Sequence, residues 1–155
     1  MTGKTHLFGG IAAGVAVIQV TDAAPGPVLI LSTLCALLPD ICHRGSRIGR
    51  KLKIVSWLVS SLFGHRTVTH SLLFLGVGSW LLYLFAPDPA YAYGYAAGVS
   101  SHLLLDALTA KGIQLFWPIP WRIRFPLYTK TGGVVEWFVL MALIGYIGYA
   151  GLAVQ

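Results

Sequence analysis

Apolar residues divide the chain into five long hydrophobic stretches, separated by shorter polar segments. They predict helices at about residues 6–20, 28–41, 68–86, 91–109 and 134–153. The last three match the roughly 20 residues that a helix needs to cross a bilayer. The first two are shorter, so we expect them to extend into flanking turns or to lie where the bilayer is locally thinned. The pattern predicts an all-α membrane protein with about five transmembrane helices in a single domain, residues 1–155.

A different periodicity occupies residues 47–63, between the second and third spans. Its apolar residues recur at helical spacing on one side, while its basic residues lie largely elsewhere; the apolar set is Ile48, Leu52, Val55, Leu58 and Val59. This pattern predicts an amphipathic helix in the cytoplasmic interface, attracted to anionic lipid. An ordinary amphipathic connector between two spans fits the same pattern.

Composition supports the membrane class. Of the residues, 56% are hydrophobic and only 10% are charged, and the mean hydropathy is +0.74. A soluble domain of this size could not bury so much apolar surface. The first apolar run lacks the basic start and the cleavage site of a signal peptide, so we expect it to be retained. Cys35 and Cys42 are about two helical turns apart, too far for a disulfide, and are expected to be thiols.

The basic residues are distributed very unevenly. All 11 fall before the first span, between the second and third, or between the fourth and fifth: Lys4, Arg44, Arg47, Arg50, Lys51, Lys53, Arg66, Lys111, Arg122, Arg124 and Lys130. Short loops rich in Lys and Arg stay in the cytoplasm. We therefore predict a cytoplasmic N-terminus and an external C-terminus. This topology accounts for the net charge of +6 without nucleic acid, which we do not expect as a partner.

The same topology places most of the remaining ionisable residues at one depth. All five histidines and three of the five acids fall near the cytoplasmic ends of the spans: His6, His43, His65, His70, His102, Asp40, Asp106 and Glu136. An ionisable group inside a membrane segment costs about 3 kcal/mol or more unless it is satisfied within the bundle. A shared metal site would satisfy many of these groups together.

Local spacing agrees with a metal site. His102 and Asp106 are four residues apart and share a helix face, and Asp40 and His43 are three apart. His65 and His70 can converge only if a helix begins between them. Thr67 or Thr69 would then be the N-cap, and the new helix terminus would also suit an anion such as phosphate.

Each residue alone has an ordinary structural explanation. Single histidines such as His6 or His43 are commonly satisfied interfacial groups, Asp40 after Pro39 fits a turn or cap, and Glu136 could pair with Arg122 or Arg124. Their common depth favours a joint role. Imidazole and carboxylate ligands suit Zn²⁺ best here, with Mn²⁺ or Fe²⁺ also possible, and there are enough for the one or two ions used in phosphoester hydrolysis.

Four segments together carry a family resemblance: Leu38–His43, Phe63–Ser71, Ser101–Thr109 and Trp117–Arg122. In order and spacing they resemble the YdjM-type family of bacterial inner-membrane, metal-dependent hydrolases. The resemblance extends from His6 to about Glu136 and implies a membrane-embedded helical fold and a metal-dependent hydrolase. The family reads PD-x-DH where this chain has Cys42 in place of the second acid. Either a ligand has been lost, in an inactive member, or a thiolate replaces it and favours Zn²⁺.

These observations lead to one principal hypothesis. We expect a membrane-embedded metal-dependent hydrolase that cleaves a phosphoester in a lipid or lipid-linked substrate at the cytoplasmic leaflet. His65, His70, His102, Asp106 and Asp40 would hold one or two divalent ions, with His6 and His43 as further ligands or supporting groups. Glu136, or an aspartate that does not bind the metal, would act as general base, and Arg66, with Arg122 and Arg124, would bind the phosphate.

A different class of protein fits some of the same residues. A metal or proton transporter, or a scaffold with a structural metal, would also place His and Asp inside a bundle. The outer half offers only Asp22 and Asp88, however, so no polar path across the membrane is apparent.

Overall fold

The computed structural model describes residues 1–43, 45–63, 67–126 and 128–153. Within them, the regular secondary structure is helical, with two isolated β-bridges. Five helices form the bundle: α1 (Gly3–Val20), α2 (Pro25–Cys35), α5 (Leu72–Phe85), α6 (Ala90–Ala107) and α7 (Val134–Ala153). Two further α-helices, α3 (Arg47–Lys51) and α4 (Lys53–Phe63), and two 3₁₀ turns, η1 (Leu38–Cys42) and η2 (Val68–His70), complete the described fold.

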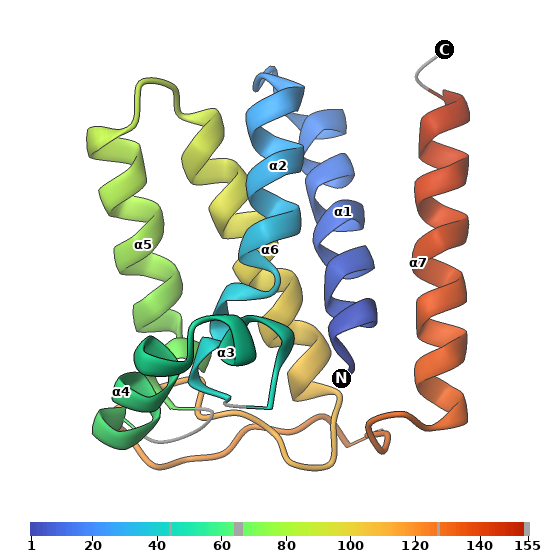
Figure 1. Ribbon diagram of the computed structural model, residues 1–155. Helices are drawn as coiled ribbons and strands as arrows, with labels where there is room; N and C mark the ends of the chain where they lie inside the picture. The colour runs from blue at the N-terminus through green and yellow to red at the C-terminus, as the bar shows by residue number, and fades with distance from the viewer. Residues whose placement is uncertain (44, 64–66, 127, 154–155) are drawn as a thin grey trace.

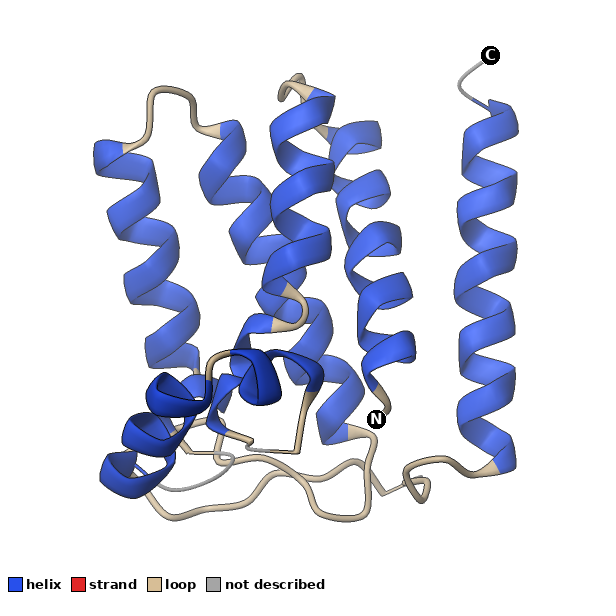
Figure 2. Ribbon diagram, viewed as in Figure 1, coloured by secondary structure: helices blue, strands red, loops and turns tan. Residues whose placement is uncertain are grey.

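The five long helices stand side by side and alternate in direction (Figure 1). The start of α1, the short helices α3 and α4, and the segment from 108 to 133 gather at one end of the bundle (Figures 1 and 2). The all-helical prediction is therefore confirmed for the described residues. The segment from 108 to 133 closes this end, where Ile113 is buried and pairs with Ile123 in a β-bridge.

Helix α6 is the centre of the bundle. It packs against α1, α2 and α5, whereas α7 packs chiefly against α1. The apolar core lies along α6 and includes Tyr95, Val99 and Leu103. Tyr95 also ties α6 to α5, because its hydroxyl donates a 2.8 Å hydrogen bond to the Phe74 carbonyl.

Glycines let three of these helices meet at backbone distance. A Cβ atom on Gly10 of α1 would lie 2.4 Å from the Ser32 carbonyl oxygen of α2, and one on Gly98 of α6 would lie equally close to the same atom. Gly14 and Gly94 make similar contacts with α2. Helices α1 and α6 thus each carry two glycines four residues apart. This is the small-residue pattern that brings helices together in membranes. These contacts fix α1, α2 and α6 as one unit.

Two segments are long and apolar enough to span a bilayer, Pro25–Cys42 and Val134–Leu152. Of the five predicted transmembrane segments, these are the two that meet the criterion among the described residues. Helices α1 and α6 have 18 residues each but carry the polar residues of the site. Helix α5 has only 14 residues, because its first predicted turn forms η2 instead. The second span reaches spanning length only by continuing through η1.

The predicted amphipathic helix over residues 47–63 is present as two helices with a bend at Leu52. Several large apolar side chains on α4 are exposed, among them Ile54 at 82% and Trp57 at 54%. Ser56 on the opposite side is buried. The described part of α4 therefore presents an apolar face that the rest of the chain leaves uncovered, as expected for a helix at a membrane interface.

We predict that Gly98→Ala destabilises the protein. The added methyl group would collide with the Ser32 carbonyl, which is backbone and cannot move aside. Forcing such a contact costs about 1–3 kcal/mol. Thermal unfolding of the detergent-purified protein should show a clearly lower melting temperature. Gly148→Ala on α7 is the matched control, because a Cβ there meets nothing within 4 Å; equal melting of the two variants would contradict the contact.

Candidate metal centre

The last two turns of α6 place an imidazole and a carboxylate side by side. His102 and Asp106 are both fully buried, with 3.8 Å between His102 Nε2 and Asp106 Oδ2. The predicted shared helix face is therefore confirmed. The other ring nitrogen of His102, Nδ1, lies 2.7 Å from the carbonyl oxygen of Ala36. Because a carbonyl only accepts hydrogen bonds, Nδ1 carries the proton, and in the neutral ring the lone pair of Nε2 faces the centre.

A second imidazole comes from the turn before α5. His70 ends η2 and is fully buried, with its Nε2 atom 3.2 Å from His102 Nε2 and 3.5 Å from Asp106 Oδ2. Its Nδ1 lies 3.1 Å from the Thr69 hydroxyl. A helical turn does start between His65 and His70, because Thr67 holds the N-cap position of the 3₁₀ turn η2. The N-cap of α5 itself is neither Thr67 nor Thr69. Ser71 caps α5 by accepting a hydrogen bond from the Phe74 N–H at 3.2 Å, so the helix begins after His70.

Two further ligand candidates come from α1 and η1. The ring of His6 stacks on that of His102 with 3.8 Å between centroids, and its Nε2 is 3.2 Å from Asp106 Oδ1. Asp40 Oδ1 is 4.0 Å from His102 Nε2. The ligand atoms form two groups that share His102, within 4.8 Å of one another in each group: His6, Asp40 and His102, and His70, His102 and Asp106.

The donor set fits a divalent metal on geometric grounds. Two nitrogens bound to one tetrahedral Zn²⁺ at about 2.05 Å lie about 3.3 Å apart. The distance of 3.2 Å between the two Nε2 atoms matches this separation. Without a metal or a shared proton, two facing lone pairs in a dry site would repel each other. The His102–Ala36 hydrogen bond supplies the orientation that metal-binding histidines characteristically have.

Buried polarity supports the same assignment. Neither ring nitrogen of His6 makes a hydrogen bond of ordinary geometry within the described residues, although His6 is fully buried. Asp106 faces imidazoles and also contacts the amino group of Met1, so its carboxylate is surrounded by groups that can carry or bind positive charge. A polar atom buried without a hydrogen bond costs a few kcal/mol. A metal ion would satisfy His6 as well as the carboxylate.

Cys42 lies at the edge of this cluster. It is buried beside the His70 ring, and its thiol donates a 3.3 Å hydrogen bond to the Pro39 carbonyl. The two cysteines are free thiols, as predicted. Cys42, where the sequence resemblance leads us to expect a second acid, thus lies next to a candidate ligand.

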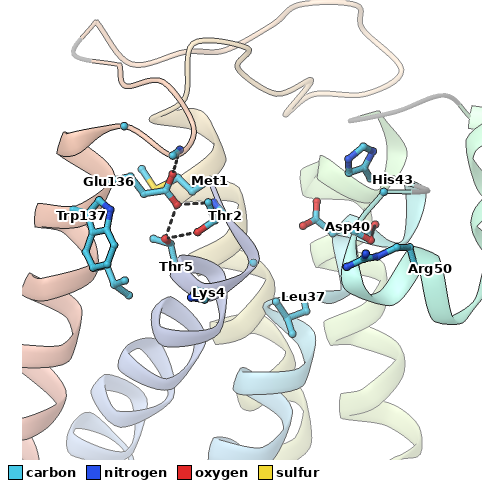
Figure 3. A pocket seen from close by; sticks show the side chains of 16 residues that line it. Met1, Thr2, Lys4, Thr5, Leu37, Asp40, His43, Arg50, Glu136 and Trp137 are labelled. Atoms are coloured by element: carbon cyan, nitrogen blue, oxygen red, sulfur yellow. Dashed lines mark hydrogen bonds between the residues drawn. The ribbon is translucent and has the colours of Figure 1, made fainter.

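A pocket of about 500 Å³ opens next to the cluster. Asp40 belongs to both, and its side chain is 20% exposed whereas His102 and Asp106 are at 0%. Figure 3 shows Asp40, His43 and Arg50 on one side of the pocket and Glu136 and Trp137 on the other, with the start of α1 between them. Asp40 is the one cluster carboxylate that also faces this pocket.

Two predicted site residues lie near the cluster but outside both groups of ligand atoms. Glu136 accepts hydrogen bonds at 2.5 Å from the Thr2 N–H and the Thr5 hydroxyl, and one at 2.7 Å from the Gly132 N–H. It links the start of α7 to the start of α1, which gives its assignment as general base no support. His43 is exposed at the pocket rim, so it contributes no metal ligand in this arrangement.

The predicted phosphate-binding arginines also lie elsewhere. Arg122 is exposed, and Arg124 stacks on the Tyr128 ring at 4.1 Å and donates to the Ala110 carbonyl at 3.3 Å. Neither arginine lines the pocket. The alternative pairing of Glu136 with either of them is not among the ion pairs of the described residues. His65 and Arg66 fall outside the described residues, so their predicted roles stay predictions.

The structure also places at the site residues to which the sequence analysis gave no role in binding a metal or a substrate. Lys4 and Arg50 line the pocket, and Ala36 and Thr69 orient the two imidazoles. Thr69 had a sequence signal, because it directly precedes His70. Lys4 and Arg50 stood out only as two of many basic residues at the same end.

Comparison with known proteins agrees with this architecture. A family described as "YdjM inner membrane protein" matches residues 1–154. The chain is 47% identical over 143 residues to a Bacillus subtilis protein described as "Uncharacterized protein YvsG", covering 92% of this chain and 89% of the relative. It is 39% identical over 158 residues to the inner membrane protein YdjM of Escherichia coli, covering 92% and 79%. No solved structure matches the chain.

The family match covers nearly the whole chain, and both relatives are more than 30% identical to it over 92% of its length. The chain therefore belongs to the YdjM family of inner membrane proteins.

Proposed function

We propose that this chain is a metal-dependent hydrolase of the bacterial inner membrane, acting on a phosphoester in a lipid or lipid-linked substrate at the cytoplasmic leaflet. The observation that carries the proposal is the buried cluster of three imidazoles and two carboxylates, one of which opens into a pocket. Structural zinc sites are closed by protein ligands, whereas catalytic sites keep an open position. The exposure of Asp40 to the pocket favours the catalytic arrangement over a structural metal in a transporter or scaffold.

The ligand types suggest which metal the site would hold. Nitrogen and carboxylate ligands in a dry pocket suit Zn²⁺ best, with Mn²⁺ and Fe²⁺ as alternatives. His70, His102 and Asp106 would hold one ion, and the neighbouring group of His6 and Asp40 provides atoms for a second. Bound there, a divalent ion supplies Lewis-acid chemistry to water and to a phosphoryl oxygen.

Different groups of the chain would orient the ligands, exclude water and accept a proton. Thr69 and the Ala36 carbonyl hold the rings of His70 and His102 in orientation. The apolar surroundings exclude bulk water from the buried face of the cluster. Asp40 lies where water from the pocket would approach, so it is placed to accept the proton as that water attacks phosphorus. This assigns to Asp40 the role of general base in the one-ion arrangement, in which it is not a metal ligand.

We also propose that α1, α2, α5, α6 and α7 all cross the membrane, with the cluster end in the cytoplasm. Alternating helix directions (Figure 1) and the gathering of the described basic residues at one end support this arrangement. At 1.5 Å per residue, the 14 residues of α5 reach about 21 Å, which requires locally thinned bilayer. A site recessed at the cytoplasmic ends of the helices is where such thinning would be expected.

Metal content tests the centre directly. We predict that detergent-purified protein contains stoichiometric divalent metal, most of it zinc, and that His70→Gln loses most of it because one ring nitrogen of the cluster is gone. Elemental analysis by mass spectrometry measures this loss. His43→Gln serves as the control and should keep its metal, since His43 lies at the pocket rim. Metal retained by His70→Gln, with the protein still monodisperse, would rule out the proposed centre.

Activity distinguishes the two carboxylates. With a panel of lipid phosphoesters, Asp40→Asn should lower kcat by about 10²–10⁴-fold, the usual contribution of a general base. Glu136→Gln should leave kcat close to that of the wild type and lower the melting temperature, because a charged acceptor of three hydrogen bonds is lost, at about 1–3 kcal/mol. The reverse pattern would return the catalytic role to Glu136.

Topology can be tested by cysteine labelling in bacterial spheroplasts. Cysteine placed at Pro87, between α5 and α6, should react with a membrane-impermeant maleimide added outside. Cysteine placed at Lys53, at the start of α4, should react only after permeabilisation. The native Cys35 and Cys42 are buried and provide the unlabelled background. External labelling at Lys53 would invert the proposed orientation.

A further inference from the structure

The pocket beside the cluster is lined by both cationic and apolar side chains. Two cationic side chains line it, Lys4 from the first turn of α1 and Arg50 from α3, together with Ser46. Leu37, Trp137 and Leu140 provide apolar lining. Figure 3 shows Lys4 and Arg50 on separate elements that border the same space. A site of this kind suits a ligand with an anionic part and a hydrocarbon part.

From this arrangement we propose that the pocket binds the anionic headgroup of a membrane lipid, with Lys4 and Arg50 as the residues that recognise its negative charge. This inference rests on the proposed function and names the substrate class for the same site. The cluster and the pocket share Asp40, so a headgroup held by Lys4 and Arg50 lies next to the proposed metal ligands. The two cations would replace Arg122 and Arg124 as phosphate-binding residues.

Charge balance within the pocket supports an anionic ligand. Its acids are Asp40 and Glu136, and Glu136 is already engaged by three hydrogen bonds. Lys4 and Arg50 are exposed, and none of the described ion pairs involves either. Two cations that line one pocket favour the binding of a ligand of opposite charge. The planar guanidinium of Arg50 can in addition bind two phosphate oxygens at once.

The apolar residues that line the pocket favour a lipid over free phosphate as its ligand. Trp137 and Leu140 are three residues apart and share a face of α7, and Trp137 is 64% exposed. Helix α7 packs chiefly on α1, which leaves this face toward the membrane. A tryptophan at the cytoplasmic end of a span is the side chain expected at headgroup depth. Inorganic phosphate would gain nothing from these residues, whereas an acyl chain would bury apolar surface against them.

Binding of a non-cleavable lipid analogue tests the inference. The probe is the phosphonate analogue of dihexanoyl phosphatidic acid, titrated by calorimetry into metal-loaded, full-length protein in non-ionic detergent. We expect Lys4→Gln and Arg50→Gln each to weaken binding about tenfold or more, the usual value of one charge-assisted hydrogen bond. Lys51→Gln, next to Arg50 but outside the pocket, should bind like the wild type. Lys4→Arg should restore most of the affinity.

Two comparison ligands decide between sources of negative charge. Dihexanoyl phosphatidylcholine, which has no net charge, should bind much more weakly than the anionic analogue. Inorganic phosphate should also bind much more weakly, and Trp137→Ala should reduce affinity for the lipid analogue alone. Equal binding of phosphate and lipid analogue, or equal loss in Lys4→Gln, Arg50→Gln and Lys51→Gln, would overturn the inference.

The outcome is separable from that of the hydrolase proposal. The analogue cannot be cleaved, so its affinity does not depend on turnover. Tight, Lys4- and Arg50-dependent binding by a protein that cleaves no phosphoester would keep the headgroup site and reject the hydrolase. Turnover of a lipid phosphoester with an unchanged KM in Lys4→Gln and Arg50→Gln would do the opposite.

Discussion

The close approach of α1, α2 and α6 around Ser32 is the contact on which the rest of the structure depends. Lipid tails are as apolar as leucine, so helices inside a bilayer gain little from hydrophobic burial and associate through close packing instead. Gly10 and Gly98 allow that packing from two sides of the same carbonyl. His6 lies one turn before Gly10, and His102 lies one turn after Gly98. A helix spacing set by side chains larger than hydrogen would move these two stacked rings apart.

Burial makes the charge of Asp106 costly unless neighbouring groups compensate it. A carboxylate in a medium of low dielectric requires a nearby positive charge or several donors, and Asp106 is fully buried. The amino group of Met1 contacts it, and a neutral imidazole can donate one hydrogen bond to it. A divalent ion would compensate its charge further and would also bind a ring nitrogen of His6, which makes no hydrogen bond of ordinary geometry among the described residues. The same reasoning explains why these polar groups occur together at one end rather than singly along the bundle.

Much of the site followed from the sequence, and the reasons are specific. Helical spacing placed His102 beside Asp106, and the segregation of basic residues placed His6, Asp40 and His70 at the same depth. The N-cap of α5 could not be chosen, because Thr67, Thr69 and Ser71 all suit it and only tertiary contacts decide among them. The segment from 108 to 133 has no periodicity, so the positions of Arg122 and Arg124 could not be predicted. The paired glycines of α1 and α6 were a readable signal that we did not use.

The route by which a substrate reaches the cluster follows from what surrounds it. Toward the opposite end, the interior is filled by α6 packed on α1, α2 and α5, with Ser32 enclosed between glycines. At the near end, Asp40 opens into a pocket bordered by the first turns of α1 and α7. Helix α7 touches the bundle chiefly through α1, so in the proposed membrane orientation the pocket would have a side toward lipid as well as one toward water. A lipid substrate of the proposed kind would then enter with its headgroup at the level of Lys4 and its chains still in the leaflet. Such an entry needs no polar path across the membrane, which favours surface hydrolysis over transport.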